Sequence, residues 1–184
     1  ILIPLFISFL VTMPLLSQER FPSYYSQNDM ELATPGTILF GLNGYSNPAI
    51  LTYLKQPNLY FTWNDNNSGL NNVSRYGLFA ALPYFGFSMV DYKNNDFSIN
   101  DYKLSAAFGS SALSFGFDYG WSTGDVNYYN RSNIFTLGAI YRPADFLSFS
   151  LIGNLPTDNE KEGIFGIGIR PFGSYRFTLF GDYL

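Results

Sequence analysis

The stretch "ALSFGFDYGW", Ala112 to Trp121, alternates large apolar side chains with small or polar ones. In an extended strand, successive side chains point to opposite faces. One face would then carry Leu113, Phe115, Phe117, Tyr119 and Trp121, and the other Ser114, Gly116, Asp118 and Gly120. This period of two predicts a β-strand between two different environments. The large face must therefore meet either a protein core or a lipid bilayer.

Eight other segments have strand character, and most show the same alternation, so the sequence predicts an all-β, antiparallel up-and-down meander of nine strands. The predicted strands are Asn58–Asn64, Ser74–Leu82, Tyr84–Asp91, Asp101–Gly109, Ala112–Trp121, Asn133–Arg142, Phe146–Asn154, Gly163–Arg170 and Tyr175–Tyr183. Their lengths approach the roughly 9–11 residues that a tilted strand needs to cross a bilayer.

The connections between these strands alternate in length. Short turns are predicted at Leu82-Pro83, Ser110-Ser111, Arg142–Asp145 and Pro171–Ser174, and longer polar loops at Asp65–Val73, Tyr92–Asn100, Ser122–Ser132 and Leu155–Glu162. Outer-membrane β-barrels have short periplasmic turns and longer external loops. The pattern therefore predicts a barrel of this type, with the N-terminus in the periplasm.

The composition agrees with a surface that does not face water everywhere. Charged residues make up 13% of the 184 residues and aromatic residues 20%, whereas soluble domains carry about 25% charged residues. The chain has no cysteine and no histidine, which excludes thiol nucleophiles, imidazole bases and most zinc sites. Its net charge of −4 and the lack of a basic run argue against nucleic acid as a partner. No catalytic, cofactor-binding or metal-binding residue is predicted, and no cofactor is expected.

A secreted, soluble β-sandwich would also produce alternation, but its outward face should be more highly charged. Here the small face carries only isolated charges, such as Lys103, Asp118 and Arg176. We therefore expect Leu113, Phe115 and Phe117 to contact lipid.

Aromatic residues cluster near both predicted strand ends, as in the interfacial girdles of membrane barrels, although chance in an aromatic-rich chain is the alternative. They are Tyr119, Trp121, Tyr128 and Tyr129 near the loops, and Tyr141, Phe146, Phe172 and Tyr175 near the turns.

Three regions are predicted along the chain. Residues 1–17 are expected to be a signal peptide that lacks its start, because the apolar run is too short to span a bilayer and ends at polar residues. Residues 18–57 are expected to form a periplasmic segment, and residues 58–184 a barrel segment that continues beyond the fragment, since single-chain bacterial barrels have even strand numbers.

A short helix is predicted in the middle region. Asn47 can cap it, Pro48 suits its first position, and residues 49–55 can form about two turns. Ile50, Leu51 and Leu54 would form an apolar stripe. The helix could plug the barrel, dock at its periplasmic mouth, or simply connect, and the sequence leaves these alternatives open.

Longer stretches resemble the N-terminal region of bacterial signal peptide peptidase A-like proteins. The stretches are "FPSYYSQNDMELATPGTILFGLNGYSNPAILTYLKQPNLYFTW", "RYGLFAALPYFGFSM", "NRSNIFTLGAIYRP" and "IRPFG". The resemblance implies a β-rich region before peptidase domains that use a serine nucleophile and a lysine base. The four lysines of the chain do not match a catalytic segment of that family. They are Lys55, Lys93, Lys103 and Lys161, of which Lys93 and Lys161 lie in predicted loops. We therefore expect the active site downstream of Leu184.

A shorter resemblance concerns the turn Asn47-Pro48-Ala49, which is similar to the N-terminal region of long-chain fatty acid transporter-type barrels. Two functions are therefore expected as alternatives. The first is the membrane-embedded barrel portion of an envelope protein, whose partners would be the outer-membrane bilayer, downstream domains of the same chain and the barrel-assembly machinery. The second is an outer-membrane transporter or porin-like barrel for apolar solutes. A soluble periplasmic β-protein remains the third alternative.

Overall fold

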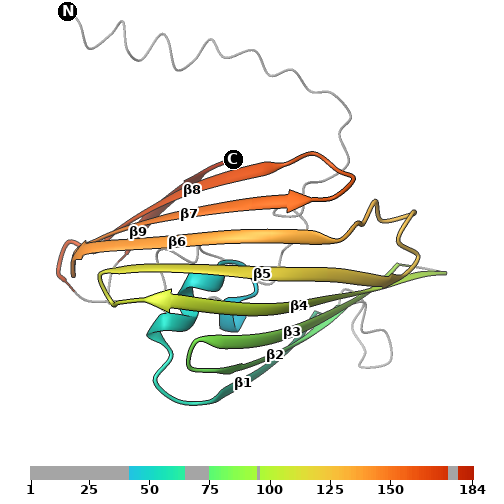
Figure 1. Ribbon diagram of the computed structural model, residues 1–184, viewed down its shortest axis with the longest axis horizontal. Helices are drawn as coiled ribbons and strands as arrows, with labels where there is room; N and C mark the ends of the chain where they lie inside the picture. Colours follow the sequence, from blue (N-terminus) through green and yellow to red (C-terminus); the bar gives the residue numbers. More distant parts are fainter. Residues whose placement is uncertain (1–41, 65–74, 95, 174–177) are drawn as a thin grey trace, which may run out of the picture.

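A computed structural model describes residues 42–64, 75–94, 96–173 and 178–184. In these ranges the protein is all-β with little helix, and nine antiparallel strands follow one another in a single sheet in the order β1 to β9 (Figure 1). The strands are β1 (Asn58–Asn64), β2 (Arg75–Leu82), β3 (Phe85–Asn94), β4 (Phe97–Gly109), β5 (Leu113–Gly124), β6 (Ile134–Ala144), β7 (Leu147–Pro156), β8 (Glu162–Ile169) and β9 (Leu179–Tyr183). The predicted up-and-down meander is thus confirmed.

The two faces of the sheet are strongly different. In β5, Phe117 is 51% exposed whereas its neighbour Asp118 is fully buried, and the alternation continues along the strand. The small and polar side chains therefore point to the inner face, and the large apolar ones point outward. The large face of "ALSFGFDYGW" is not a protein core.

The outward face is apolar over its whole width. Its exposed large side chains on β2 to β8 are Leu82, Phe85, Leu104, Phe108, Leu113, Phe115, Phe117, Tyr119, Phe135, Leu137, Tyr141, Leu151, Phe165 and Ile169. By the same alternation, the charged residues at outward positions of these strands are Asp91 and Lys93, close to the end of β3. Monomeric soluble proteins rarely expose a continuous apolar surface of this extent.

Two short 3₁₀ helices precede the sheet, η1 (Leu42–Gly44) and η2 (Pro48–Tyr53), and both pack on its inner face. Asn47 caps η2 as predicted, because its side chain accepts a hydrogen bond from the Ala49 N–H and Pro48 occupies the first turn. The helix is tighter and shorter than expected, since it ends at Tyr53. Residues 42–54 are called the inner segment below. Within the described ranges, no helix is both long and apolar enough to cross a membrane.

One predicted loop is wrong. Residues 92–100 were expected to form a long external loop, but β3 and β4 pair through most of it, up to Asn94 opposite Phe97. Ile99 is completely buried, which anchors the start of β4 on the inner face. Strand β5 likewise extends to Gly124, three residues beyond its predicted end. The predicted loop at 65–73, and the residues Tyr175 and Arg176, lie outside the described residues.

The two edge strands, β1 and β9, run in the same direction. Strand direction reverses at each step across an antiparallel sheet, and an odd number of strands, β2 to β8, lies between them. Among the described residues, β1 pairs with β2 alone and β9 with β8 alone. The described ladders therefore form an open sheet.

Candidate functional site

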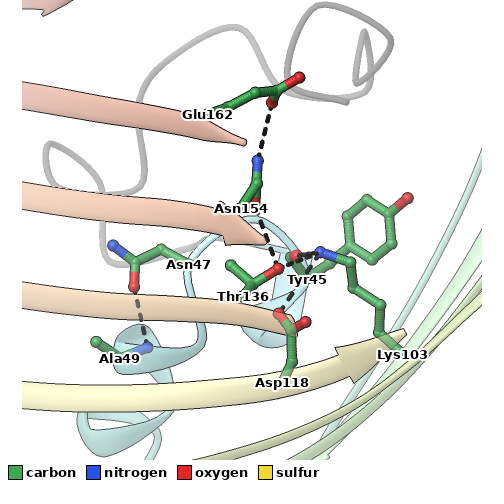
Figure 2. Close-up of polar contacts among 8 residues, drawn as sticks. All are labelled: Tyr45, Asn47, Ala49, Lys103, Asp118, Thr136, Asn154 and Glu162. Atoms are coloured by element: carbon green, nitrogen blue, oxygen red, sulfur yellow. Dashed lines mark hydrogen bonds and ion pairs between the residues drawn. The ribbon is translucent and has the colours of Figure 1, made fainter. Parts of the chain in front are cut away.

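Four polar residues stand directly opposite one another on adjacent strands of the inner face. Asp118 of β5 faces Thr136 of β6, Thr136 faces Asn154 of β7, and Asn154 faces Glu162 of β8. The Thr136 hydroxyl donates to Asn154 Oδ1 at 3.1 Å, and Asn154 Nδ2 donates to Glu162 Oε2 at 3.2 Å (Figure 2). We call these four residues the polar ladder.

Lys103 of β4 links the polar ladder to the inner segment. Its ammonium lies 3.5 Å from Asp118 Oδ2 and donates to the backbone carbonyl of Tyr45 at 3.0 Å and to Thr136 Oγ1 at 3.4 Å (Figure 2). The same ammonium lies 4.8 Å from the centre of the Tyr45 ring. Because Asp118 is fully buried, a paired cation is needed to offset the cost of removing its charge from water.

Tyr45 is buried beside this ion pair. Burial raises the pKa of its phenol well above the ordinary value, and the carboxylate of Asp101 acts in the same direction. The ring therefore stays neutral over the physiological range, and its electron-rich face is available to the Lys103 ammonium.

Glycines on the inner face make room for the inner segment. A Cβ at Gly116 would lie 2.5 Å from the Ala49 backbone nitrogen, and one at Gly138 would overlap the Asn47 side-chain oxygen. A Cβ at Gly86 would lie 2.8 Å from the carbonyl oxygen of Asn43. Three strands thus carry glycine where the inner segment touches the sheet, and larger residues would exclude it.

Apolar side chains of the inner segment complete the contact with the sheet. Leu51 packs with Ala81 and Ala107, and Ile50 packs with Ile140. Leu42 contacts a separate buried group that contains Phe79, Val90 and Tyr45. Burial of these side chains favours the docked position by about 1.5–3 kcal/mol for each large residue.

Polar contacts fix both ends of the inner segment. At one end, Asn43 Nδ2 donates to the Phe79 carbonyl at 2.8 Å. At the other, the Tyr53 hydroxyl donates to the Ser111 carbonyl at 3.0 Å, and the Arg142 guanidinium lies 4.0 Å from the centre of the Tyr53 ring. The inner segment is therefore attached to the sheet at its ends as well as at Lys103.

A second polar cluster lies at the end of the sheet where β5 connects to β6. Arg131 Nη2 lies 3.0 Å from Asp101 Oδ2, and the Ser122 hydroxyl donates to Asp101 Oδ1 at 2.6 Å. These contacts hold the connection between β5 and β6 against β4. Asn159 Nδ2 then donates to the Asn130 carbonyl at 2.8 Å, which joins this connection to the next one.

These clusters hold the inner segment and the connection between β5 and β6 against the sheet. Within the described ranges, no group of three His, Cys, Asp or Glu residues is placed to hold a metal ion. The Lys103 ammonium is engaged by three oxygen atoms, so it is not arranged as a free base beside a serine nucleophile. The arrangement positions the inner segment and neutralises buried charge.

Sequence reasoning singled out Lys103 and Asp118 as isolated charges on the small face, but the structure pairs them. It missed the roles of Thr136, Asn154 and Glu162. A signal exists in the sequence for Thr136, which lies between the outward Phe135 and Leu137, whereas Glu162 was placed in a predicted loop. Their mutual pairing depends on strand register, which alternation alone does not give.

The comparisons with known proteins add no relative: no protein-family model, curated protein or solved structure matches the chain.

Proposed function

We propose that this chain is the membrane-embedded β-barrel portion of a bacterial envelope protein, located in the outer membrane with its N-terminal side in the periplasm. The observation that carries the proposal is the outward face of the sheet. It is lined by exposed Leu, Phe, Tyr and Ile side chains, while Asp118 and its partner Lys103 lie on the inner face.

The physical argument compares the two solvents that could cover this face. In water, the exposed apolar side chains would favour association or precipitation. In lipid, the same side chains are well solvated, and the backbone polar groups are satisfied by strand pairing. The inward position of Asp118 and Lys103 also favours lipid, since a charge at the bilayer midplane on the outer face costs about 2–4 kcal/mol.

Closure of the barrel is part of this proposal. The edges β1 and β9 run in the same direction, so all-antiparallel closure requires an odd number of further strands between them. Those strands would remove two edges that are costly in lipid. We propose that they come from the protein to which this stretch belongs, and that the barrel-assembly machinery inserts the closed barrel.

The resemblance to signal peptide peptidase A-like proteins supports a membrane-anchoring role for this region. In such an anchoring role, the barrel holds downstream peptidase domains at the membrane, and the catalytic serine and lysine lie in those domains. Lys103 supports this division of roles, because its contacts with Asp118 and Tyr45 give it a structural task.

A second candidate is a transporter or porin-like barrel for apolar solutes. The observation that favours it is the inner segment, which occupies the inner face against β1 to β6 as a plug would. A transporting barrel should pass an apolar probe into vesicles, and the flux should rise when the inner segment is displaced. An anchoring barrel should show no flux under either condition.

Membrane extraction tests the main proposal. The chain, produced with its leader in a Gram-negative host, should fractionate with the outer membrane. It should resist extraction by alkaline carbonate and require detergent for release. Recovery in the soluble periplasmic fraction without detergent would refute the proposal and favour the soluble β-protein.

A further inference from the structure

Three buried polar side chains on the inner face have no hydrogen-bond partner in the part of the chain that the structure describes. They are Ser88 on β3, Ser105 on β4 and Asp118 on β5, and each is at most 4% exposed. The Lys103 ammonium lies 3.5 Å from Asp118, but neither carboxylate oxygen accepts a hydrogen bond from a described residue. Buried polar groups are normally satisfied by protein atoms or by ordered water, because leaving them unpaired is costly.

Strand register places these three side chains next to the ion pair that Lys103 forms with Asp118 (Figure 2). Ser105 stands directly opposite Asp118, and Ser88 stands directly opposite Lys103. Lys103 and Ser105 are consecutive inward residues of β4. Directly opposite residues of an antiparallel pair have Cβ atoms about 4.5–5.5 Å apart. One water molecule can therefore bridge Ser105 and Asp118, which do not hydrogen-bond to each other directly.

The charge and size of this site select its ligand. The Lys103 ammonium would repel a further cation, and the Asp118 carboxylate would repel an anion, so a neutral ligand is favoured. That ligand must donate hydrogen bonds, because a carboxylate only accepts them, and a serine hydroxyl can do both. Ser105 has Gly86 on its other side, so the side chains in this row are short. Water is the smallest neutral molecule that meets these requirements.

From these positions we infer that ordered water is bound between Ser88, Ser105 and Asp118. The three side chains supply the polar partners that a buried water needs, which is about three hydrogen bonds. Ser105 is then a positioning residue. Through water it holds the Asp118 carboxylate beside Lys103, and Lys103 in turn holds the carbonyl of Tyr45 in the inner segment. The inference does not depend on the proposed membrane location, since all of these groups lie on the inner face.

The sign of a stability change tests the inference. Ser105→Ala, in the full chain purified in detergent, should lower the urea midpoint, because it removes one partner of the water and leaves Asp118 less well solvated. Ser114→Ala is the matched control: Ser114 is also buried and unpaired among the described residues, but it stands opposite Gly109 and Ile140. The control should be neutral or stabilising, since it removes an unpaired hydroxyl. A midpoint for Ser105→Ala that equals or exceeds that of the unsubstituted chain would overturn the inference.

Magnetisation transfer from water, measured by NMR in detergent micelles, separates bound water from a purely structural effect of Ser105. The amide proton of Asp118 should show a cross-peak to long-lived water, and Ser105→Ala should weaken it. The amide proton of Ser114 should show no such cross-peak, which controls for relayed exchange through a serine hydroxyl. Absence of the cross-peak at Asp118, or an equal one at Ser114, would count against the bound water.

Discussion

Gly116 on β5 lies against the start of η2 so closely that a Cβ would sit 2.5 Å from both the Pro48 carbonyl carbon and the Ala49 nitrogen. These are backbone atoms, which cannot rotate away as a side chain could. The docking of the inner segment therefore depends on the absence of a side-chain carbon at Gly116.

Gly116→Ala should displace the inner segment or strain β5, and should lower the free energy of unfolding by about 1–3 kcal/mol. Gly153→Ala is the matched control, because a Cβ there would meet nothing within 4 Å. That control should be neutral or slightly stabilising. Urea unfolding midpoints in detergent measure both, and equal effects of the two substitutions would contradict the docked position of the inner segment.

Lys103→Met should be strongly destabilising, because it leaves the buried Asp118 carboxylate without its cation; breaking a buried pair costs about 3–5 kcal/mol. Lys161→Met, in the exposed connection between β7 and β8, should change little. Adding Asp118→Asn to Lys103→Met should recover part of the loss, as a double-mutant cycle would detect. Strict additivity of the two substitutions would show that the pair is not coupled.

Phe117→Arg should prevent stable membrane assembly, because it places a charge at the middle of the proposed lipid face at a cost of about 2–4 kcal/mol. Asp158→Arg, which introduces the same side chain into an exposed connection, should be tolerated. The heat-modifiable shift on a gel and the amount in the outer-membrane fraction report assembly. If both variants assemble as well as the unsubstituted chain, the outward face does not contact lipid.

Cysteine labelling should distinguish the two ends of the sheet, and the chain has no cysteine of its own to interfere. Asn127→Cys, in the long connection after β5, should react with an impermeant reagent in intact cells. Asp145→Cys, in the turn between β6 and β7, should react only after the outer membrane is opened. The reverse pattern would invert the proposed orientation, and equal reactivity would favour a soluble location.

The buried phenol of Tyr45 should make stability fall at alkaline pH. Its pKa is raised in the folded state, whereas an unfolded tyrosine ionises near pH ~10. The folded state therefore holds the proton more tightly, so the contribution is present below that pH and is lost as the pH rises further. Tyr45→Phe should show a shallower decline in urea midpoint between neutral and strongly alkaline pH. An identical decline would place Tyr45 in contact with water.

The number of strands, and the side of the sheet that the residues of β5 take, could be predicted from the sequence. β1 was predicted with its observed bounds, and the large face of β5 was identified, because side-chain direction in a strand follows from a local period of two. The cap and first turn of η2 were also predictable, since they depend on Asn47 and Pro48 alone.

Contacts between distant residues were decided only by the tertiary structure. Strand register determines the pairing of Lys103 with Asp118, the alignment of Thr136 with Asn154, and the position of the inner segment. A register shift of one residue would move each of these side chains to the other face of the sheet, although the local alternation in the sequence would stay the same. The hairpin between β3 and β4 has the same origin, because polar residues that locally favour a loop are held as strand by pairing and by the buried Ile99.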